Sequence, residues 1–150
     1  RKLRYLLPMA VTANKSVDID ADASAILEVL ADVEGLPSWS PVHKKCEVVD
    51  RFDDGKPHHV KMHVSIIGVN DEQLVEYTWT DSEVSWTLVE STQQKAQDGR
   101  YTLTPKGNGT HVEFELTVDP KIPLPGFLVK KGTKTILEAA TEGLRQQVVG

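Results

Sequence analysis

Hydrophobic and polar positions alternate with a period of two along most of this chain. The alternation runs over residues 11–20 and then over six further segments, at 46–52, 60–67, 74–80, 84–89, 96–104 and 111–118. Such a pattern predicts strands that bury one face. Short connectors rich in Gly, Asn and Asp, such as residues 68–71, separate the later segments. We therefore expect consecutive strands to pair as antiparallel hairpins.

Two other segments have the 3.6-residue spacing of helices that bury one face. The first follows Asp20 or Asp22, and either residue is suited to the N-cap. Its apolar positions are Ala23, Ile26, Leu27, Leu30 and Val33. Gly35 ends this helix, and residues 36–41 predict a short second helix or a tight corner. After a proline-rich lead-in, a long helix is expected from about Phe127 to Val148, with an apolar stripe at Val129, Ile136, Leu137, Ala140, Leu144 and Val148.

This order of elements predicts one α+β domain over residues 9–150. A seven-stranded antiparallel sheet twists and curves strongly. Only the C-terminal helix and the two short helices after the first strand are available to cover its buried face. One helix is too narrow to fill the concavity, so we expect a hollow between helix and sheet. Residues 1–8 are interpreted as an N-terminal extension or a cloning remnant, with a short membrane-surface anchor as the second interpretation.

Composition and charge exclude several classes of protein. The chain has 150 residues, of which 39% are hydrophobic and 26% charged, close to the average for soluble globular domains. A formal charge of −5 argues against nucleic acid as a partner. No apolar run approaches the roughly 18–20 residues that span a bilayer. The single cysteine, Cys46, is unable to form an internal disulfide, so we expect a cytoplasmic protein whose one thiol is buried and unreactive.

Strand parity predicts which side chains line the concave face. Met62 and Val64 share one face of their strand and His59, Lys61 and His63 the other, so the apolar pair is expected to point inward. The same reasoning turns the large side chains of the next four strands inward, at Tyr77, Trp79, Trp86, Tyr101 and Phe114. Such a wall suits a flat or greasy ligand with one or two polar atoms. An ordinary filled core has the same pattern.

No set of residues predicts a catalytic or metal site. His59 and His63 lie four residues apart on one strand, roughly 13 Å, which is too far for them to share an ion. His43, beside the Trp39 corner, is a secondary candidate for the mouth of the pocket. The carboxylates fall mostly on the solvent face of the strands. We therefore expect no metal ion, no cofactor and no catalytic residue.

Four blocks of the sequence carry a resemblance to a known family. They are Val17–Ala21, Leu27–Trp39, Gly99–Pro105 with Gly109-Thr110, and Pro123–Leu128. On these blocks the chain resembles the START-like superfamily, also called SRPBCC, Bet v 1-like or helix-grip proteins. Within it, the chain is most similar to the polyketide cyclase/dehydrase and lipid-transport group common in actinobacteria. The resemblance implies the helix-grip fold and an internal pocket, but lipid carriers, hormone receptors, quinone-binding factors and cyclases all use this scaffold.

The leading hypothesis is a carrier or sensor that holds a lipid, polyketide or isoprenoid-like molecule in an internal pocket. Tyr77 or Tyr101 would orient the polar end of the ligand. The residues expected to line the pocket are Trp39, Met62, Val64, Tyr77, Trp79, Trp86, Tyr101, Phe114, Leu137 and Leu144. The alternative is a polyketide cyclase or dehydratase-like enzyme, and the third hypothesis is a protein-interaction scaffold. The sequence does not indicate which oligomeric state the protein has.

Overall fold

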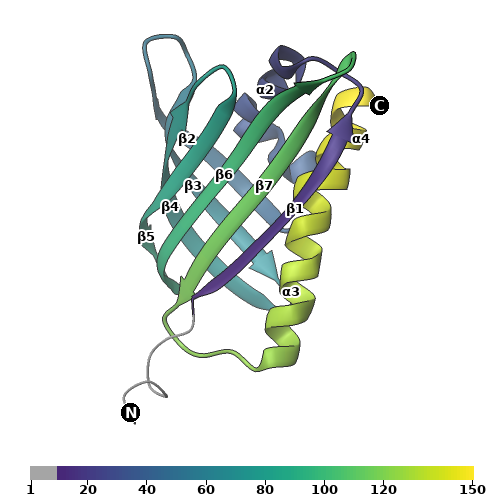
Figure 1. The fold of residues 1–150 in the computed structure, drawn as a ribbon. Coiled ribbons are helices and arrows are strands. Elements are labelled where there is room, and N and C mark those ends of the chain that lie inside the picture. The colour runs from purple at the N-terminus through teal and green to yellow at the C-terminus, as the bar shows by residue number, and fades with distance from the viewer. Residues whose placement is uncertain (1–9) are drawn as a thin grey trace.

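Residues 10–150 are described by the computed structural model, in which seven strands form one antiparallel sheet (Figure 1). The strands are β1 (Val11–Ile19), β2 (His43–Arg51), β3 (Pro57–Ile66), β4 (Val69–Trp79), β5 (Glu83–Ser91), β6 (Gln94–Lys106) and β7 (Gly109–Pro120). Their spatial order is β1-β7-β6-β5-β4-β3-β2, so β2 to β7 form consecutive hairpins and β1 pairs with β7. The predicted curved seven-stranded sheet is confirmed. The predicted extension, residues 1–8, lies outside the described residues.

Two short helices follow β1, as predicted, but their bounds differ: the first ends at Ala31 rather than at Gly35, and Val33 belongs to the second. The first, α2 (Ala23–Ala31), begins after Asp22, whose carboxylate accepts a hydrogen bond of 3.0 Å from the Ala25 amide. This N-cap satisfies one of the free N–H groups of the first helical turn. The second, η1 (Val33–Ser38), is a 3-10 helix that packs against β2. It therefore covers one edge of the sheet.

The terminal helix lies on the concave side of the sheet, next to β1 (Figure 1). It consists of α3 (Gly126–Glu138), a π-helical segment η2 (Ala139–Gly143) and α4 (Leu144–Val149). The predicted extent of this helix is confirmed, but its middle is not α-helical, because a π segment inserts an extra residue that apolar spacing does not reveal. Within residues 10–150, no helix is both long and apolar enough to cross a bilayer.

The β3–β4 turn is shorter than the predicted connector, which comprised the four residues 68–71. Only Ile67 and Gly68 lie between the two strands, and both have positive φ angles, of 46° and 84°. Two such residues make the type I′ turn that matches the twist of a hairpin. A β-branched residue rarely adopts this conformation, so Ile67 is locally strained. Asn70 and Asp71, expected in the connector, belong to β4.

The core extends over the whole inner face of the sheet. Apolar side chains that expose 1% or less are Ile19, Ile26, Val33, Val60, Val75, Val84, Val112 and Leu144. Apolar side chains that stay only partly buried against the core include Ile66, Leu88, Leu116, Ile136 and Leu137. In α3 the one buried residue is Gly132, so this helix is less completely buried than the strands. Cys46 is buried as predicted, and burial, with a smaller effect of Glu34, raises the pKa of its thiol to about 12.

Candidate functional site

Five aromatic side chains pack in one group on the inner side of β4 to β7. They are the predicted residues Tyr77, Trp79, Trp86, Tyr101 and Phe114. Tyr77 and Trp79 are stacked with ring centroids 5.3 Å apart, and the tilted pairs among the five lie at 5.0–6.2 Å. Aromatic pairs at these separations attract one another beyond their simple burial. The structure thus brings together all five residues that strand parity turned inward.

Trp86 lies against the neighbouring strand because residue 99 is glycine. A Cβ atom at Gly99 would lie 2.2 Å from the indole atoms Cε2 and Cζ2 of Trp86. The indole therefore occupies the space that a side chain on β6 would fill. This close approach gives a physical reason for the glycine in the Gly99–Pro105 block. A larger residue here would push the indole toward the interior.

A chain of hydrogen bonds begins at the Trp86 indole. Its Nε1, which only donates, bonds to Oε1 of Gln97 at 2.9 Å, and this fixes which end of the Gln97 amide is nitrogen. Nε2 of Gln97 donates to Oε1 of Gln73 at 3.1 Å and to Oε1 of Gln94 at 2.8 Å. Gln73 therefore uses its oxygen as an acceptor in this chain. No residue of the range 10–150 accepts a hydrogen bond from its Nε2, although Gln73 is only 7% exposed.

Asp71 ends this chain at the β5–β6 turn. Its Oδ2 accepts a hydrogen bond of 2.7 Å from Gln94, and its carboxylate also accepts from the hydroxyls of Ser91 and Thr92. The backbone N–H groups of Thr92 and Gln93 donate to Oδ1 as well. These bonds compensate for the desolvation of a carboxylate whose residue is 5% exposed. The β5–β6 turn is thus held to the start of β4.

Sequence reasoning missed this polar end of the inner face. Asp71 was expected in a connector, and neither Gln73 nor Gln97 was considered as part of the pocket. The alternation of side chains along β4 could have revealed it. Asp71, Gln73 and Tyr77 occupy alternate positions of this strand, and all three are buried. Polar residues in line with a buried aromatic residue indicate a polar patch inside the fold.

The hydroxyls of the two inner tyrosines have different surroundings. Tyr101 donates a hydrogen bond of 2.9 Å to the carbonyl of Ala140 in η2. Tyr77 makes no hydrogen bond to any residue between 10 and 150, and the one buried, unpaired side-chain atom in that range is Oδ1 of Asp119. The Tyr77 oxygen therefore keeps accessible surface. Burial raises the pKa of both phenols, so both are protonated donors.

The remaining predicted pocket residues fall into two groups. Met62 and Val64 on β3 are 6% and 7% exposed, and Leu137 on α3 is partly buried against the same core. Leu144 is completely buried. Trp39 ends η1 and approaches Gly143 of η2, where a Cβ atom would lie 3.7 Å from its ring. The residues on β3 and α3 are therefore better placed than Leu144 and Trp39 to contact a ligand.

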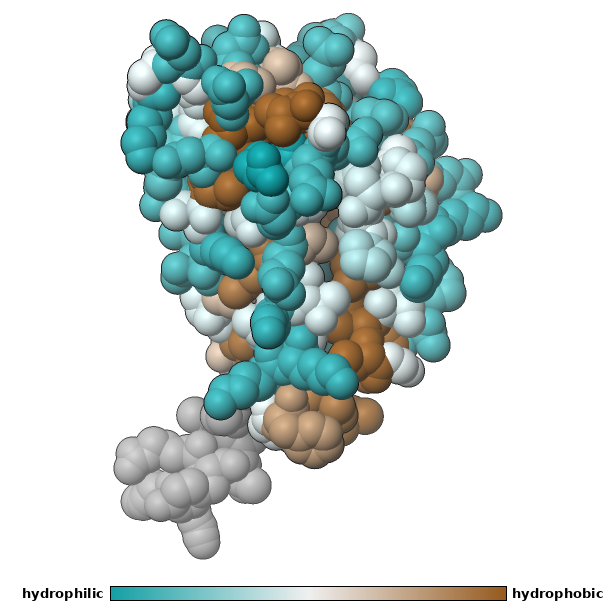
Figure 2. Space-filling view, turned by 90° about the vertical axis from the view of Figure 1, so that its right-hand side faces the viewer, coloured by the Kyte–Doolittle hydropathy of each residue, from teal (hydrophilic) through white to brown (hydrophobic). Residues whose placement is uncertain are grey.

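The face that carries α3 exposes apolar side chains near the start of that helix (Figure 2). Ile122 and Phe127 expose 67% and 72% of their surfaces. One helical turn further, a Cβ atom at Gly132 would lie 3.2 Å from the Ile66 side chain and 3.5 Å from that of Ile67. The glycine in this helix therefore permits close packing of α3 on the β3–β4 turn.

Two shallow, open hollows on the surface of residues 10–150 lie away from α3. One crosses the outer face of β2 to β5, where Lys45, Glu47, Lys61, His63, Glu72 and Glu90 contribute to its lining. The other lies beside the β6–β7 turn, between residues 18–20 and 106–110. A cavity beneath α3 stays a prediction.

His43 forms a short hydrogen bond with Ser40. Its Nδ1 lies 2.7 Å from Oγ of Ser40, which is 3% exposed. Burial lowers the pKa of His43 to about 4, so its imidazole is neutral at pH 7. A neutral imidazole is able to accept a proton from a bound molecule. Its place at the mouth of a pocket stays a prediction.

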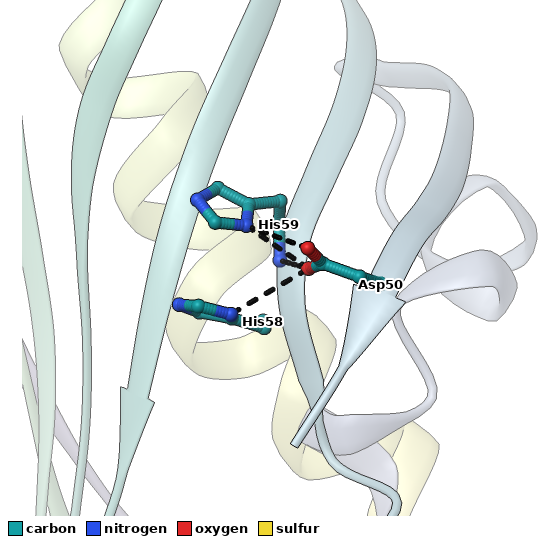
Figure 3. A group of neighbouring side chains, drawn as sticks. All are labelled: Asp50, His58 and His59. Carbon is teal, nitrogen blue, oxygen red and sulfur yellow. Dashed lines mark hydrogen bonds and ion pairs between the residues drawn. The ribbon is translucent and has the colours of Figure 1, made fainter.

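Asp50, His58 and His59 form the group of residues best suited to hold a metal ion within residues 10–150 (Figure 3). One potential ligand atom from each residue lies within 4.8 Å of the other two. Asp50 is on β2 and the two histidines are neighbours on β3. Hydrogen bonds from His59 lower the pKa of Asp50, so this carboxylate is ionised at neutral pH. Of the pair considered from sequence, His59 belongs to this group and His63 does not.

Comparisons with known proteins agree with this architecture. Residues 10–149 match the family model described as "Polyketide cyclase / dehydrase and lipid transport". No curated protein is a significant match. A solved START superfamily protein from Mycobacterium smegmatis is 27% identical, with a TM-score of 0.81 over 91% of this chain and 96% of that one. The Zhui aromatase/cyclase from Streptomyces sp. R1128 has a TM-score of 0.80 over 93% and 94% of the two chains, but at 14% identity it shows the fold alone.

Proposed function

Since the chain belongs to the polyketide cyclase / dehydrase and lipid transport family, in the START-like superfamily that its sequence implied, we propose that it is a carrier or sensor of a hydrophobic small molecule. The ligand binds between α3 and the inner face of the sheet, and it is a lipid, a polyketide or an isoprenoid-like compound. One observation carries this proposal: Gln73 and Tyr77 present unused hydrogen-bond donors on an inner face that is otherwise largely apolar.

Both donors belong to β4 and point to the same side of it. They lie four residues apart with Val75 between them, which corresponds to roughly 13 Å along a strand. Both donor atoms keep some accessible surface, because the one buried, unpaired side-chain atom among residues 10–150 is Oδ1 of Asp119. A ligand with an acceptor oxygen at either position would gain a hydrogen bond worth about 0.5–1.5 kcal/mol. Carbonyl, carboxyl and hydroxyl oxygens all fit this requirement.

The apolar part of the ligand is expected to lie along α3. Inward-facing side chains there, such as Leu88, Leu116 and Leu137, are only partly buried. Covering their exposed surface would contribute about 25 cal/mol for each Å² removed from water. The same region contacts the strained β3–β4 turn through Gly132. A small outward movement of α3 from this turn would admit the ligand.

Native mass spectrometry of the protein purified from its own host tests the proposal. We expect a co-purified hydrophobic compound that carries at least one oxygen. A hydrophobic dye should compete with this compound and alter tryptophan fluorescence, because Trp86 and Trp79 line the same face. Met62→Trp should block the dye, whereas Val49→Trp, at a position 54% exposed, should not. Equal dye binding by parent, Met62→Trp and Val49→Trp proteins would contradict an internal site.

A second candidate function, a cyclase or dehydratase-like enzyme, is favoured by one observation. His43 is neutral at pH 7 and lies 2.7 Å from the hydroxyl of the buried Ser40, so it is able to accept a proton, although a pKa of about 4 makes it a weak base. If the chain is such an enzyme, His43→Asn should abolish conversion of the bound compound, while the variant should still bind that compound. Recovery of an unchanged ligand after long incubation with the parent protein would favour the carrier or sensor.

A further inference from the structure

Two β-bulges bring His58 and His59 onto one side of β3. The β2–β3 register shifts on both sides of Asp50, which pairs with His59, so Val49 on β2 and His58 on β3 have no opposite residue. In a regular strand, consecutive side chains point to opposite faces of the sheet. A bulge breaks this alternation. The two imidazole rings therefore lie side by side, with centroids 4.1 Å apart, and Asp50 faces both (Figure 3).

Each of these imidazoles has a carboxylate near both of its ring nitrogens. The Nδ1 atoms of His59 and His58 lie 2.9 Å and 3.6 Å from Oδ1 of Asp50. The Nε2 atoms of His58 and His59 lie 3.1 Å and 3.9 Å from the carboxylate oxygens of Glu76 on β4. A neutral imidazole has only one N–H group, and its other nitrogen carries a lone pair.

A bound cation would take the place of the hydrogen bond between His59 Nδ1 and Asp50. The Nδ1 lone pairs of both imidazoles and Oδ1 of Asp50 would then face the ion, and the hydrogen bond between His58 Nε2 and Glu76, 3.1 Å long, would be kept. Metal-binding histidines usually donate their second ring N–H to a carboxylate in this way. Glu76 therefore has the position of the outer carboxylate of a metal site.

We propose that Asp50, His58 and His59 bind one divalent transition-metal ion of the zinc class on the outer face of the sheet. Two imidazole nitrogens and one carboxylate oxygen suit Zn²⁺ or Co²⁺. Bonds of about 2.1 Å in a tetrahedral site place ligand atoms roughly 3.4 Å apart. The present atoms, within 4.8 Å of one another, reach that spacing through small rotations of side chains, and the side chain of Asp50 is 51% exposed.

The ion would link the edge strand β2 to its neighbour β3. β2 lies at one end of the sheet, and its pairing with β3 is interrupted at the two bulges. A metal bridge from Asp50 to the two histidines would join the strands where the backbone ladder is weakest. Because the ion binds the folded chain, it should also raise the melting temperature with increasing concentration. The expectation that the chain has no metal site rested on the distance between His59 and His63.

Isothermal titration calorimetry with Zn²⁺ tests the site on the chelator-treated full chain. We expect one ion per chain, and a roughly 10–100-fold weaker affinity for Glu76→Gln. The ligand variants His58→Ala, His59→Ala and Asp50→Asn should lose more. His63→Ala is the matched control, because His63 is also a half-buried histidine of β3 beside a carboxylate, with Nδ1 3.0 Å from Glu72. Its affinity should equal that of the parent.

Co²⁺ provides a second measurement that does not depend on stability. The parent chain should develop the visible absorption of cobalt bound to nitrogen and oxygen ligands, and Asp50→Asn, which keeps a hydrogen-bond acceptor for His59, should not. Circular dichroism in chelator should show that all variants are folded. The proposal is overturned if the parent binds no Zn²⁺ at millimolar concentration. It is also overturned if His63→Ala weakens binding as much as His59→Ala does.

Discussion

The Tyr101 hydroxyl donates a hydrogen bond of 2.9 Å to the carbonyl of Ala140, and this bond joins the inner face of the sheet to the π-helical segment of the terminal helix. A π segment widens the helix and weakens its regular backbone bonding. An outside donor to one of its carbonyls therefore helps to hold the helix on the sheet. Tyr77 has the same side chain on the same face but no such partner.

Replacing Tyr101 by Phe should lower the free energy of unfolding by about 1 kcal/mol, because Ala140 loses a buried donor. Urea unfolding monitored by tryptophan fluorescence measures this loss. Tyr77→Phe is the matched control and should leave stability within about 0.5 kcal/mol of the parent. Equal losses for the two variants would show that the Ala140 bond has no special role in stability.

Gly99→Ala should destabilise the protein by about 1–3 kcal/mol, because the new methyl group meets the Trp86 indole. The displaced indole should also lose its hydrogen bond to Gln97, which would shift the tryptophan emission. Gly126→Ala serves as the control, since no atom lies within 4 Å of a Cβ placed there. An unchanged emission spectrum in Gly99→Ala would mean that the indole does not lie over β6.

Gln73→Glu tests the polar end of the proposed ligand site. The variant keeps the oxygen that accepts from Gln97 but replaces the free N–H donors by a second oxygen. Affinity for an oxygen-bearing ligand should fall about 10-fold or more, through loss of one hydrogen bond and repulsion of the acceptor. Titration of the compound identified by mass spectrometry measures this change. Gln147→Glu, an exposed substitution on α4, adds the same charge and should have no effect.

His43 should make stability depend on pH between about 4 and 6.5. Its pKa is lowered to about 4 in the folded chain by burial, whereas an unfolded histidine titrates near 6.5. The unfolded state therefore binds more protons in this window, and stability falls as the pH falls from about 6.5 toward 4. The total loss is up to roughly 3 kcal/mol.

Urea unfolding at pH 7 and pH 5 measures this dependence. His43→Asn should flatten the pH profile. A profile for His43→Asn as steep as that of the parent would assign the effect to other groups.

The period-two alternation of strands and the 3.6-residue spacing of helices predicted the regular elements of this fold. Tyr77, Trp86 and Tyr101 could be assigned to the inner face because alternation is a local property of each strand. The bulge at His58 could not be predicted, since one extra residue leaves no periodic signal. The bond from Gln97 to Gln73 joins residues 24 positions apart and depends on strand register. Contacts between side chains of different strands become visible only when the register is known.

The π segment at residues 139–143 has a consequence for how the terminal helix is encoded. An inserted residue rotates everything that follows it by about 100° about the helix axis. Leu144, at the start of α4, is completely buried, and α4 contacts both α2 and β1. The orientation of α4 relative to α3 therefore depends on this extra residue. Deleting one residue between 139 and 143 would leave both halves helical, yet α4 would present its apolar side to water.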